Sequence, residues 1–120
     1  MELRQEVIHH AISSYDQTGV TINKTIYQQS LIVSAKTLIC PWPVVSIENL
    51  KLDHWQAVLK LAPKIVIFGT GNKLLFPSAE QLSPLYQANI AVEVMSTPSA
   101  CRTYNILLGE GREVLSALII

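Results

Sequence analysis

A short apolar run near the middle of the chain, "KIVIFGT" at residues 64–70, limits the fold more than any other feature of the sequence. A nearly continuous apolar stretch of this length is typical of a central β-strand that is buried on both faces. Such a strand needs cover on each side of its sheet, and helical patterns lie before and after it in the sequence. The run therefore predicts an α/β fold.

The order of the expected elements after residue 50 defines the kind of α/β fold. Helices are expected over residues 52–61, 77–89 and 98–108, and strands over residues 64–70, 72–76, 90–95 and 113–120. The strand at 90–95 is expected to be buried like the one at 64–70. Because strands alternate with helices, we predict a three-layer architecture: a mixed, mostly parallel central sheet with helices on its faces.

The first third of the chain reads as a β layer of its own. "HHAISSY" and "VTI" are strand-like, with the turn signal "DQTG" between them and a second turn at "NK" after them. "SLIVSA" at residues 30–35 is rich in β-branched and apolar residues. We therefore expect an N-terminal β-hairpin or meander layer, within a single domain over residues 1–120.

The segment "CPWPVV" that follows is a rigid, extended connection, because two prolines fix its backbone. It presents the indole of Trp42. The indole either covers one end of the core or offers a stacking surface to a ligand, and the first role is the expected one because tryptophan is highly buried on average.

Low charge points to association with other chains. Hydrophobic residues make up 49% and charged residues 15% of the chain, and nine basic residues balance nine acidic ones. Little polar surface is then available, which favours a homo-oligomer, most simply a symmetric dimer, or a protein partner. The Lys and Arg residues are spread along the chain, so nucleic acid is not an expected partner.

The sequence predicts a cytoplasmic protein. Residues 1–14 contain no continuous apolar segment of a secretory signal, and Glu2 and Glu6 disagree with a transit peptide. No apolar run approaches the roughly 20 residues that span a bilayer, so membrane insertion is not expected. Cys40 and Cys101 form no CxxC motif, and a small secreted domain usually carries more cysteines.

The histidines form no motif for a metal or for catalysis. His9 and His10 are neighbours on an expected strand, so they point to opposite faces. His54 follows Asp53, but no HExxH motif, nucleophile elbow or Ser–His–Asp set accompanies them. We therefore expect no metal and no cofactor.

The stretch "FGTGNK" at residues 68–73 is a candidate ligand site, because strand ends in α/β sheets are where ligands bind. It lacks the third glycine of a dinucleotide fingerprint and the Walker A spacing, so we do not predict a phosphate loop. Gly69 and Gly71 are expected to supply an unusual backbone conformation or a close approach. Thr70, Asn72 and Lys73 remain candidates for lining a pocket.

The helix at 98–108 carries the other candidates. Thr97 is the expected N-cap and Pro98 the first helical residue. Helical spacing places an apolar face inward, formed by Ala100, Cys101, Tyr104, Leu107 and Leu108, and it directs Arg102 and Asn105 outward. Cys101 near a helix N-terminus is a candidate reactive thiol, but a buried thiol is usually a small hydrophobe. Arg102 either pairs with Glu110 or Glu113, or forms an anion or partner surface with Asn105 and Arg112.

The motifs "IVIFGTGNKLLFPS" and "VEVMSTPSACRTYNILLGEGREVLSALI" resemble a small family of α/β proteins of unknown function. This family includes the mitochondrial complex I assembly factor 3 proteins. The resemblance covers most of the chain and implies a compact three-layer α/β fold with a β extension. It implies no established enzyme activity and no catalytic residues, while the eukaryotic members act as assembly factors.

Two classes of function follow. The first is a non-enzymatic binding or assembly module for a respiratory or other multiprotein complex. The second is a small-molecule or anion-binding protein, or an enzyme, with a pocket between Gly69-Thr70-Gly71 and the helix at 98–108.

Overall fold

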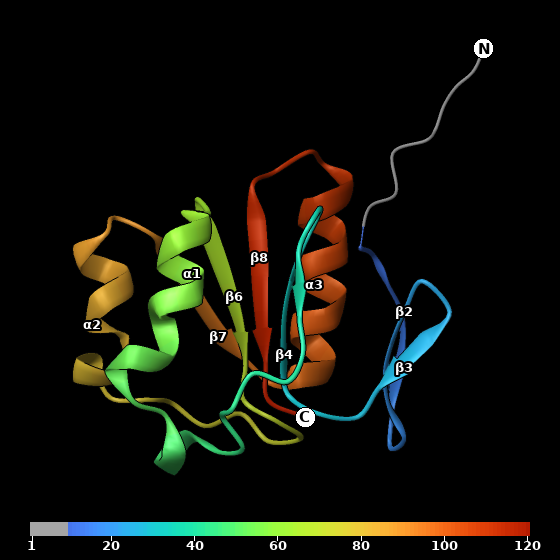
Figure 1. Ribbon diagram of the computed structural model, residues 1–120, viewed down its shortest axis with the longest axis horizontal. Coiled ribbons are helices and arrows are strands. Elements are labelled where there is room, and N and C mark those ends of the chain that lie inside the picture. The colour runs from blue at the N-terminus through green and yellow to red at the C-terminus, as the bar shows by residue number, and fades with distance from the viewer. Residues whose placement is uncertain (1–9) are drawn as a thin grey trace.

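The computed structural model describes residues 10–120, which form two β-sheets and three α-helices (Figure 1). The predictions that concern His9 and the N-terminal segment lie outside the described residues. The elements follow one another as β1 (Ile12–Asp16), β2 (Gly19–Ile22), β3 (Thr25–Tyr27), β4 (Leu31–Ser34), β5 (Leu38–Ile39), η2 (Ile47–Asn49), η3 (Leu52–Trp55), α1 (Gln56–Leu61), β6 (Ile65–Gly69), α2 (Ala79–Gln87), β7 (Ala91–Met95), α3 (Thr97–Gly109) and β8 (Val114–Leu118), where η denotes a 3₁₀ helix.

The larger sheet has the strand order β5-β4-β8-β6-β7. β8 lies in its centre, parallel to β6 and antiparallel to β4. β7 pairs with β6 in parallel, whereas β5 pairs with β4 in antiparallel fashion. The mixed sheet is thus confirmed, but parallel and antiparallel pairings are equal in number, so the sheet is not mostly parallel. One reason is the tight turn between β4 and β5, since a turn of this length joins only antiparallel strands.

Helices lie on both faces of this sheet, which confirms the three-layer architecture (Figure 1). α1 and α2 cover one face, where Trp55 and Phe68 pack edge to face with ring centroids 5.4 Å apart. α3 covers the other face, and the small sheet β1-β2-β3 lies beside α3. Val20 and Ile22 of this small sheet join the same apolar cluster as Leu31 and Val33 of β4.

The small sheet is the predicted N-terminal β layer. β1 pairs with β2, and β2 with β3, both antiparallel. The second hairpin turns at Asn23 and Lys24, whose φ angles are 51° and 70°. Two successive residues with positive φ are typical of a two-residue hairpin turn, and they match the twist of the flanking strands.

Residues 72–76 do not form the predicted strand. They belong to a loop, and the side chains of Leu74, Leu75 and Phe76 are 48%, 46% and 74% exposed. The loop is held by Thr70, whose hydroxyl donates to the carbonyl of Lys73 at 2.6 Å and accepts from the amide of Leu75 at 3.1 Å. These bonds fold the chain back, so the apolar run is presented to solvent instead of being added to the sheet.

The strand predicted at 90–95 exists as β7, but the expectation that it is buried is wrong. β7 is an edge strand with β6 as its neighbour, and Ala91 and Glu93 are exposed. β8, in contrast, is buried along its whole length. The outcome for Trp42 is the expected one: it is 3% exposed and packs against Trp55 with ring centroids 5.4 Å apart.

Candidate functional site

The Gly69-Thr70-Gly71 turn lies directly against the start of α3. A Cβ atom on Gly69 would stand 2.9 Å from Thr97 Oγ1, so glycine is required there for close approach of the two backbones. Gly71 has a φ of +102°, a conformation that glycine adopts without strain. Both expected roles of these glycines are confirmed. The contact closes the space between the turn and α3 at this point.

Thr97 is the first residue of α3, and the prediction that it is the N-cap is wrong. The N-cap is Ser96, while Thr97 is fully buried. The Thr97 hydroxyl accepts from the amide of Gly71 at 2.8 Å and donates to the carbonyl of Ile119 at 2.7 Å. These two hydrogen bonds join the glycine turn to the end of β8. The Thr97 hydroxyl is therefore engaged in tertiary contacts and does not cap its own helix.

Asn105 is a second residue whose position differs from the prediction. It does not simply face outward, because its carboxamide holds both backbone groups of Ile12. Its Oδ1 accepts from the Ile12 amide at 2.9 Å, and its Nδ2 donates to the Ile12 carbonyl at 2.6 Å. Tyr104 Oη donates to the carbonyl of His10 at 2.8 Å, and the side chain is buried as expected. These two residues dock the N-terminal layer on α3.

A cleft of about 210 Å³ lies between β1 and the first half of α3. It brings together several predicted residues, since Cys101, Arg102 and Asn105 line it. Tyr15 lines it from β1, and the Tyr15 hydroxyl donates to Asn72 Oδ1 at 3.0 Å. The glycine-loop candidates and the helix candidates therefore meet around Tyr15. Sequence reasoning missed this residue, because its position depends on how the small sheet packs on α3.

The Cys101 thiol and the Tyr15 hydroxyl of the cleft favour their neutral forms. Burial raises the pKa of the Cys101 thiol from 9.0 to about 12, although the neighbouring Arg102 guanidinium acts in the opposite direction. Burial, and secondly the charge of Cys101, raise the pKa of Tyr15. Cys101 is 5% exposed, so it is a protonated thiol near neutral pH. The cleft can donate and accept hydrogen bonds, but it holds no thiolate.

The remaining cationic candidates are spread over the surface. Arg102 is exposed, and its Nη2 donates to Ser99 Oγ at 3.2 Å. Arg112 lies 3.7 Å from Glu110, in a surface ion pair beyond the C-terminal end of α3. Lys73 is exposed in the loop after β6. Arg112 precedes β8, whereas Lys73 follows β6. Because β6 and β8 are parallel, Arg112 and Lys73 lie at opposite edges of the sheet.

Each of the two described histidines places a ring nitrogen within hydrogen-bond distance of a backbone group. His54 Nδ1 accepts from the amide of Lys51 at 2.9 Å, and His10 Nδ1 lies 3.1 Å from the carbonyl of Ser34. Among residues 10–120, no group of three or more His, Cys, Asp or Glu side chains is placed to hold a metal ion.

Two loops at the carboxyl edge of the parallel strands carry exposed apolar side chains. One follows β6 and carries Leu74, Leu75 and Phe76; the other follows β5 and carries Val45, which is 74% exposed. Both loops leave the same edge, because Ile39 and Phe68 lie in one row of the sheet, through Ile32 and Ala117. We call these four side chains, Val45, Leu74, Leu75 and Phe76, the apolar rim. In the sequence, the rim corresponds to short apolar segments next to prolines. Such a segment is also typical of a β-strand, so the pattern alone does not identify an exposed loop.

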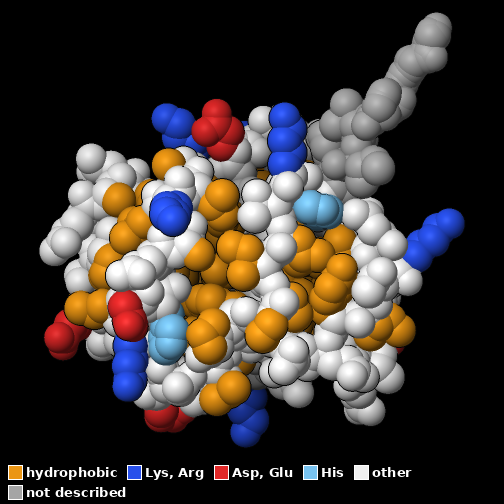
Figure 2. Space-filling view, in the orientation of Figure 1, with side chains coloured by type: hydrophobic (Ala, Val, Ile, Leu, Met, Phe, Trp, Pro, Cys, Tyr) orange, Lys and Arg blue, Asp and Glu red, His pale blue; other side chains and the backbone are white. Residues whose placement is uncertain are grey.

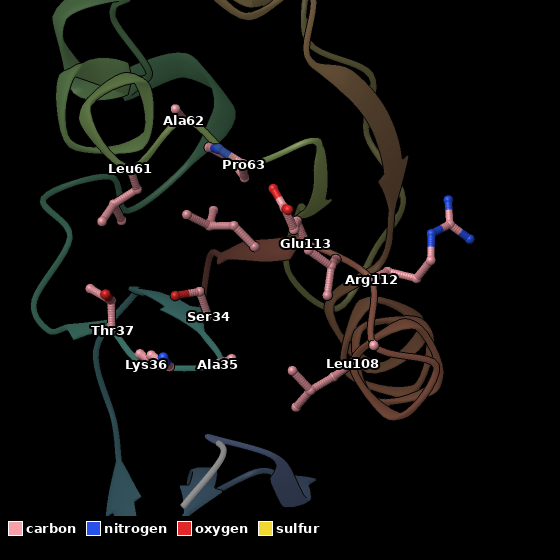
Figure 3. A pocket seen from close by; sticks show the side chains of 13 residues that line it. Ser34, Ala35, Lys36, Thr37, Leu61, Ala62, Pro63, Leu108, Arg112 and Glu113 are labelled. Atoms are coloured by element: carbon pink, nitrogen blue, oxygen red, sulfur yellow. The ribbon is translucent and has the colours of Figure 1, made fainter. Parts of the chain in front are cut away.

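A wider groove of about 390 Å³ opens at the opposite edge of the sheet. Its walls are the C-terminal end of α1, the β4–β5 turn and the start of β8. Figure 2 shows hydrophobic side chains gathered in the middle of the face between α1 and the β4–β5 hairpin. Figure 3 shows that Leu61 and Leu108 point into the groove, whereas the Arg112 guanidinium points away from it.

Comparisons with known proteins agree with this fold. Residues 12–119 match the model of a family described as "Protein of unknown function (DUF498/DUF598)". The chain is similar to a solved structure from Xanthomonas campestris, with a TM-score of 0.84 and 38% identity, over 100% of this chain and 92% of that one.

Two curated relatives carry different names. A "13 kDa major membrane protein" of Francisella tularensis is 32% identical, over 100% of this chain and 99% of that protein. In residues 10–120 no helix has the length and apolar character needed to cross a membrane. The "NADH dehydrogenase (ubiquinone) 1 alpha subcomplex assembly factor 3" of Rattus norvegicus is 36% identical, over 90% of this chain and 59% of the rat protein.

The chain thus spans little more than half of the rat assembly factor but nearly all of the family model. The family model and the curated assembly factor relatives both confirm the family resemblance seen in the sequence. The chain belongs to the DUF498/DUF598 family of proteins of unknown function, together with the assembly factor 3 proteins of NADH dehydrogenase.

Proposed function

We propose that this protein is a non-enzymatic binding module that helps to assemble a multiprotein complex, and that the apolar rim is its contact surface. The exposure of the rim carries the proposal: Val45 and Phe76 are each 74% exposed, and Leu74 and Leu75 are close to half exposed. Large apolar side chains that gather on a surface are typical of protein–protein contacts.

The loops that carry the rim are held in place, which favours binding. Gln81 Nε2 donates to the carbonyls of Ile47 and Leu50 at 2.9 and 3.1 Å, so the start of α2 is tied to the segment that follows Val45. Thr70 fixes the other loop from within. A preorganised surface loses less conformational entropy when a partner binds.

The chemistry of the β1–α3 cleft supports a role without catalysis. Its thiol is protonated near neutral pH, and its carboxamide is occupied by the backbone of Ile12. The buried hydroxyls of Thr70, Thr97 and Ser116 each donate to a backbone carbonyl, so they serve the fold. The names of the assembly factor relatives support assembly as the biological task.

Native mass spectrometry of the complex isolated from the source organism tests the proposal. The wild-type chain is expected to retain a protein partner, and Phe76→Ser to lose it, because a polar side chain would replace the most exposed aromatic of the rim. Ile106→Ser is the matched control, since Ile106 is also exposed, at 61%, but lies on α3. Retention of the partner by a combined Leu75→Ser and Phe76→Ser variant would sink the proposal.

A second candidate function rests on the β1–α3 cleft. Arg102 and Tyr15 offer a cation and a hydroxyl to a small anionic ligand in a space of about 210 Å³, and Asn72 lies next to Tyr15. The same mass spectra separate the two functions. A retained small molecule that is lost in Arg102→Ala, with no partner chain, would favour the cleft.

We also propose that the protein acts in the cytoplasm. Cys40 and Cys101 are both free thiols, which suits a reducing compartment. Fractionation of the source cells would test the location, and recovery in the membrane fraction after a high-salt wash would contradict it.

A further inference from the structure

The cleft between β1 and α3 is bounded on one side by an open strand edge. β1 is an edge strand of the small sheet, in which β2 is its neighbour. At one end of this edge, Asn105 Oδ1 accepts from the amide of Ile12 at 2.9 Å, and Asn105 Nδ2 donates to the carbonyl of Ile12 at 2.6 Å. A neighbouring strand would use the same two backbone groups. The carboxamide of Asn105 therefore takes the place of one residue of an added strand, and it closes the edge at Ile12.

Tyr15 is the next residue of β1 whose backbone faces the cleft. Asp16 and Gly19 are partners across a two-residue turn, so they form the hydrogen-bonded pair that closes the hairpin. Hydrogen-bonded and non-hydrogen-bonded pairs alternate along an antiparallel ladder, so the N–H and C=O groups of Tyr15, opposite Val20, point away from β2. The side chain of Tyr15 bonds to Asn72 through its hydroxyl. The backbone of Tyr15 thus offers one donor and one acceptor at the edge that lines the cleft.

The charge and the size of the cleft restrict what can bind there. Among the described residues that line it, Arg102 is the one that carries a charge. Asp16 lies nearby at the end of β1, but its carboxylate accepts from the amide of Thr18 at 2.8 Å, within the hairpin turn. The volume of about 210 Å³ is below the roughly 300–1,000 Å³ of pockets that enclose a drug-sized ligand. The cleft therefore suits a short anionic group that forms hydrogen bonds as a peptide backbone does.

We propose that the cleft captures the C-terminal end of another polypeptide, whose backbone pairs with Tyr15 as a short antiparallel strand and whose terminal carboxylate binds Arg102. This inference rests on the second candidate function, the binding of an anion in the cleft, and it names the ligand. A chain end fits because Asn105 closes the edge: an added strand that starts beside the hairpin turn has to stop before Ile12. Arg102 lies one helical turn before Asn105 and lines the same cleft. Strand addition supplies affinity through backbone bonds, and a carboxylate on a guanidinium adds a strong, charge-assisted one.

Nuclear magnetic resonance titration of the isotopically labelled full-length chain with acetyl-tetraalanine tests the proposal. The peptide with a free carboxylate is expected to shift the amide signals of Tyr15 and Arg102, and the amidated peptide to bind about tenfold more weakly, because the charge-assisted bond is lost. Arg102→Ala should lower the affinity for the free acid by a similar factor. Arg112→Ala is the matched control, since Arg112 is also exposed, at 52%, but lies outside the cleft. It should leave the affinity unchanged.

Two further probes separate backbone pairing from simple anion binding. A methyl group on the third or on the fourth amide nitrogen of the peptide removes one N–H each; since every second residue of a strand faces its neighbour, one of the two is expected to weaken binding about tenfold. Equal binding of the acid and the amidated peptide, or undiminished binding of both methylated peptides, would overturn the proposal. Acetate that shifts the same amides as strongly as the peptide would also overturn it, while the second candidate function would stand. Cleft amides that respond to neither probe would exclude both.

Discussion

Thr97 Oγ1 lies 2.9 Å from the position that a Cβ atom would take on Gly69, at the point where β6 meets the start of α3. The same position is 2.9 Å from a terminal carbon of Leu118 on the neighbouring strand β8. A side chain on residue 69 would therefore push α3 and β8 away from β6. The glycine is a packing requirement, and the ligand-binding role expected for the motif is not needed to explain it.

The first prediction concerns this contact. Gly69→Ala is expected to lower the free energy of unfolding by about 1–3 kcal/mol, as an added methyl group does in a filled core. Gly109→Ala is the control, because nothing lies within 4 Å of a Cβ there and alanine favours the helix. Urea denaturation of both variants measures the difference. Equal stability of the two would contradict the close packing of β6 on α3.

The second prediction concerns the docking of the N-terminal layer. Asn105→Ala leaves the amide and the carbonyl of Ile12 without their partner, which is expected to cost about 1–3 kcal/mol. Amide exchange should accelerate in β1 and β2 more than in β6. Arg102→Ala, which removes an exposed neighbour on the same helix, should stay within about 0.5 kcal/mol of wild type. A loss of protection spread evenly over both sheets would argue against a local role for Asn105.

The third prediction follows from the raised pKa of Cys101. The thiol is neutral in both states well below pH 9, but between pH 9 and about 12 the unfolded chain has mostly released the proton while the folded chain mostly keeps it. The free energy of unfolding is thus expected to fall with rising pH in this window, by up to about 1.4 kcal/mol per unit. Tyr104, whose pKa burial also raises, acts in the same direction at higher pH. The difference in slope between wild type and Cys101→Ala isolates the thiol.

Alkylation gives an independent readout of the same thiol. Cys101 should label slowly at pH 8 in the folded protein and at the ordinary rate in denaturant, whereas the more accessible Cys40 labels first. Rapid labelling of folded Cys101 at neutral pH would mean that the site holds a thiolate. The reactive-site hypothesis would then replace the structural one.

The fourth prediction concerns self-association. A chain with no net charge and few charged residues is expected to form a symmetric dimer at micromolar concentration. The dimer should persist as salt is raised, because its interface would depend on apolar burial more than on ion pairs. Sedimentation equilibrium at low and high salt measures both properties. A monomer at every concentration would refute the prediction.

Local patterns were enough to predict most elements and the two glycine roles. β6, α2 and α3 lie close to their expected positions, because their periodicity and their turn residues are local signals. The loop at 72–76 was mistaken for a strand, since an apolar run does not reveal whether a neighbouring strand is there to pair with it. In the structure, the Thr70 hydroxyl forms hydrogen bonds with the backbone of Lys73 and Leu75, and these bonds hold the segment in a loop.

The errors in the candidate site have the same origin. The partner of Asn105 is Ile12, and the partners of Thr97 are Gly71 and Ile119, all distant in sequence. Helical spacing gives the direction in which a side chain leaves its helix, but it cannot tell what lies there. Tyr15 was overlooked for this reason, although it joins the two groups of predicted residues.

The central place of β8 sets the order in which this protein is able to fold. β8 comes after every other strand in the chain, yet it is the strand on which β4 and β6 both pair. Until it arrives during synthesis, the N-terminal β layer with β4 and the β6–β7 pair have no common strand, and the apolar faces of both remain open. A ribosome-bound chain that stops before residue 114 is accordingly expected to leave these apolar faces open, since the larger sheet is completed only when β8 is present.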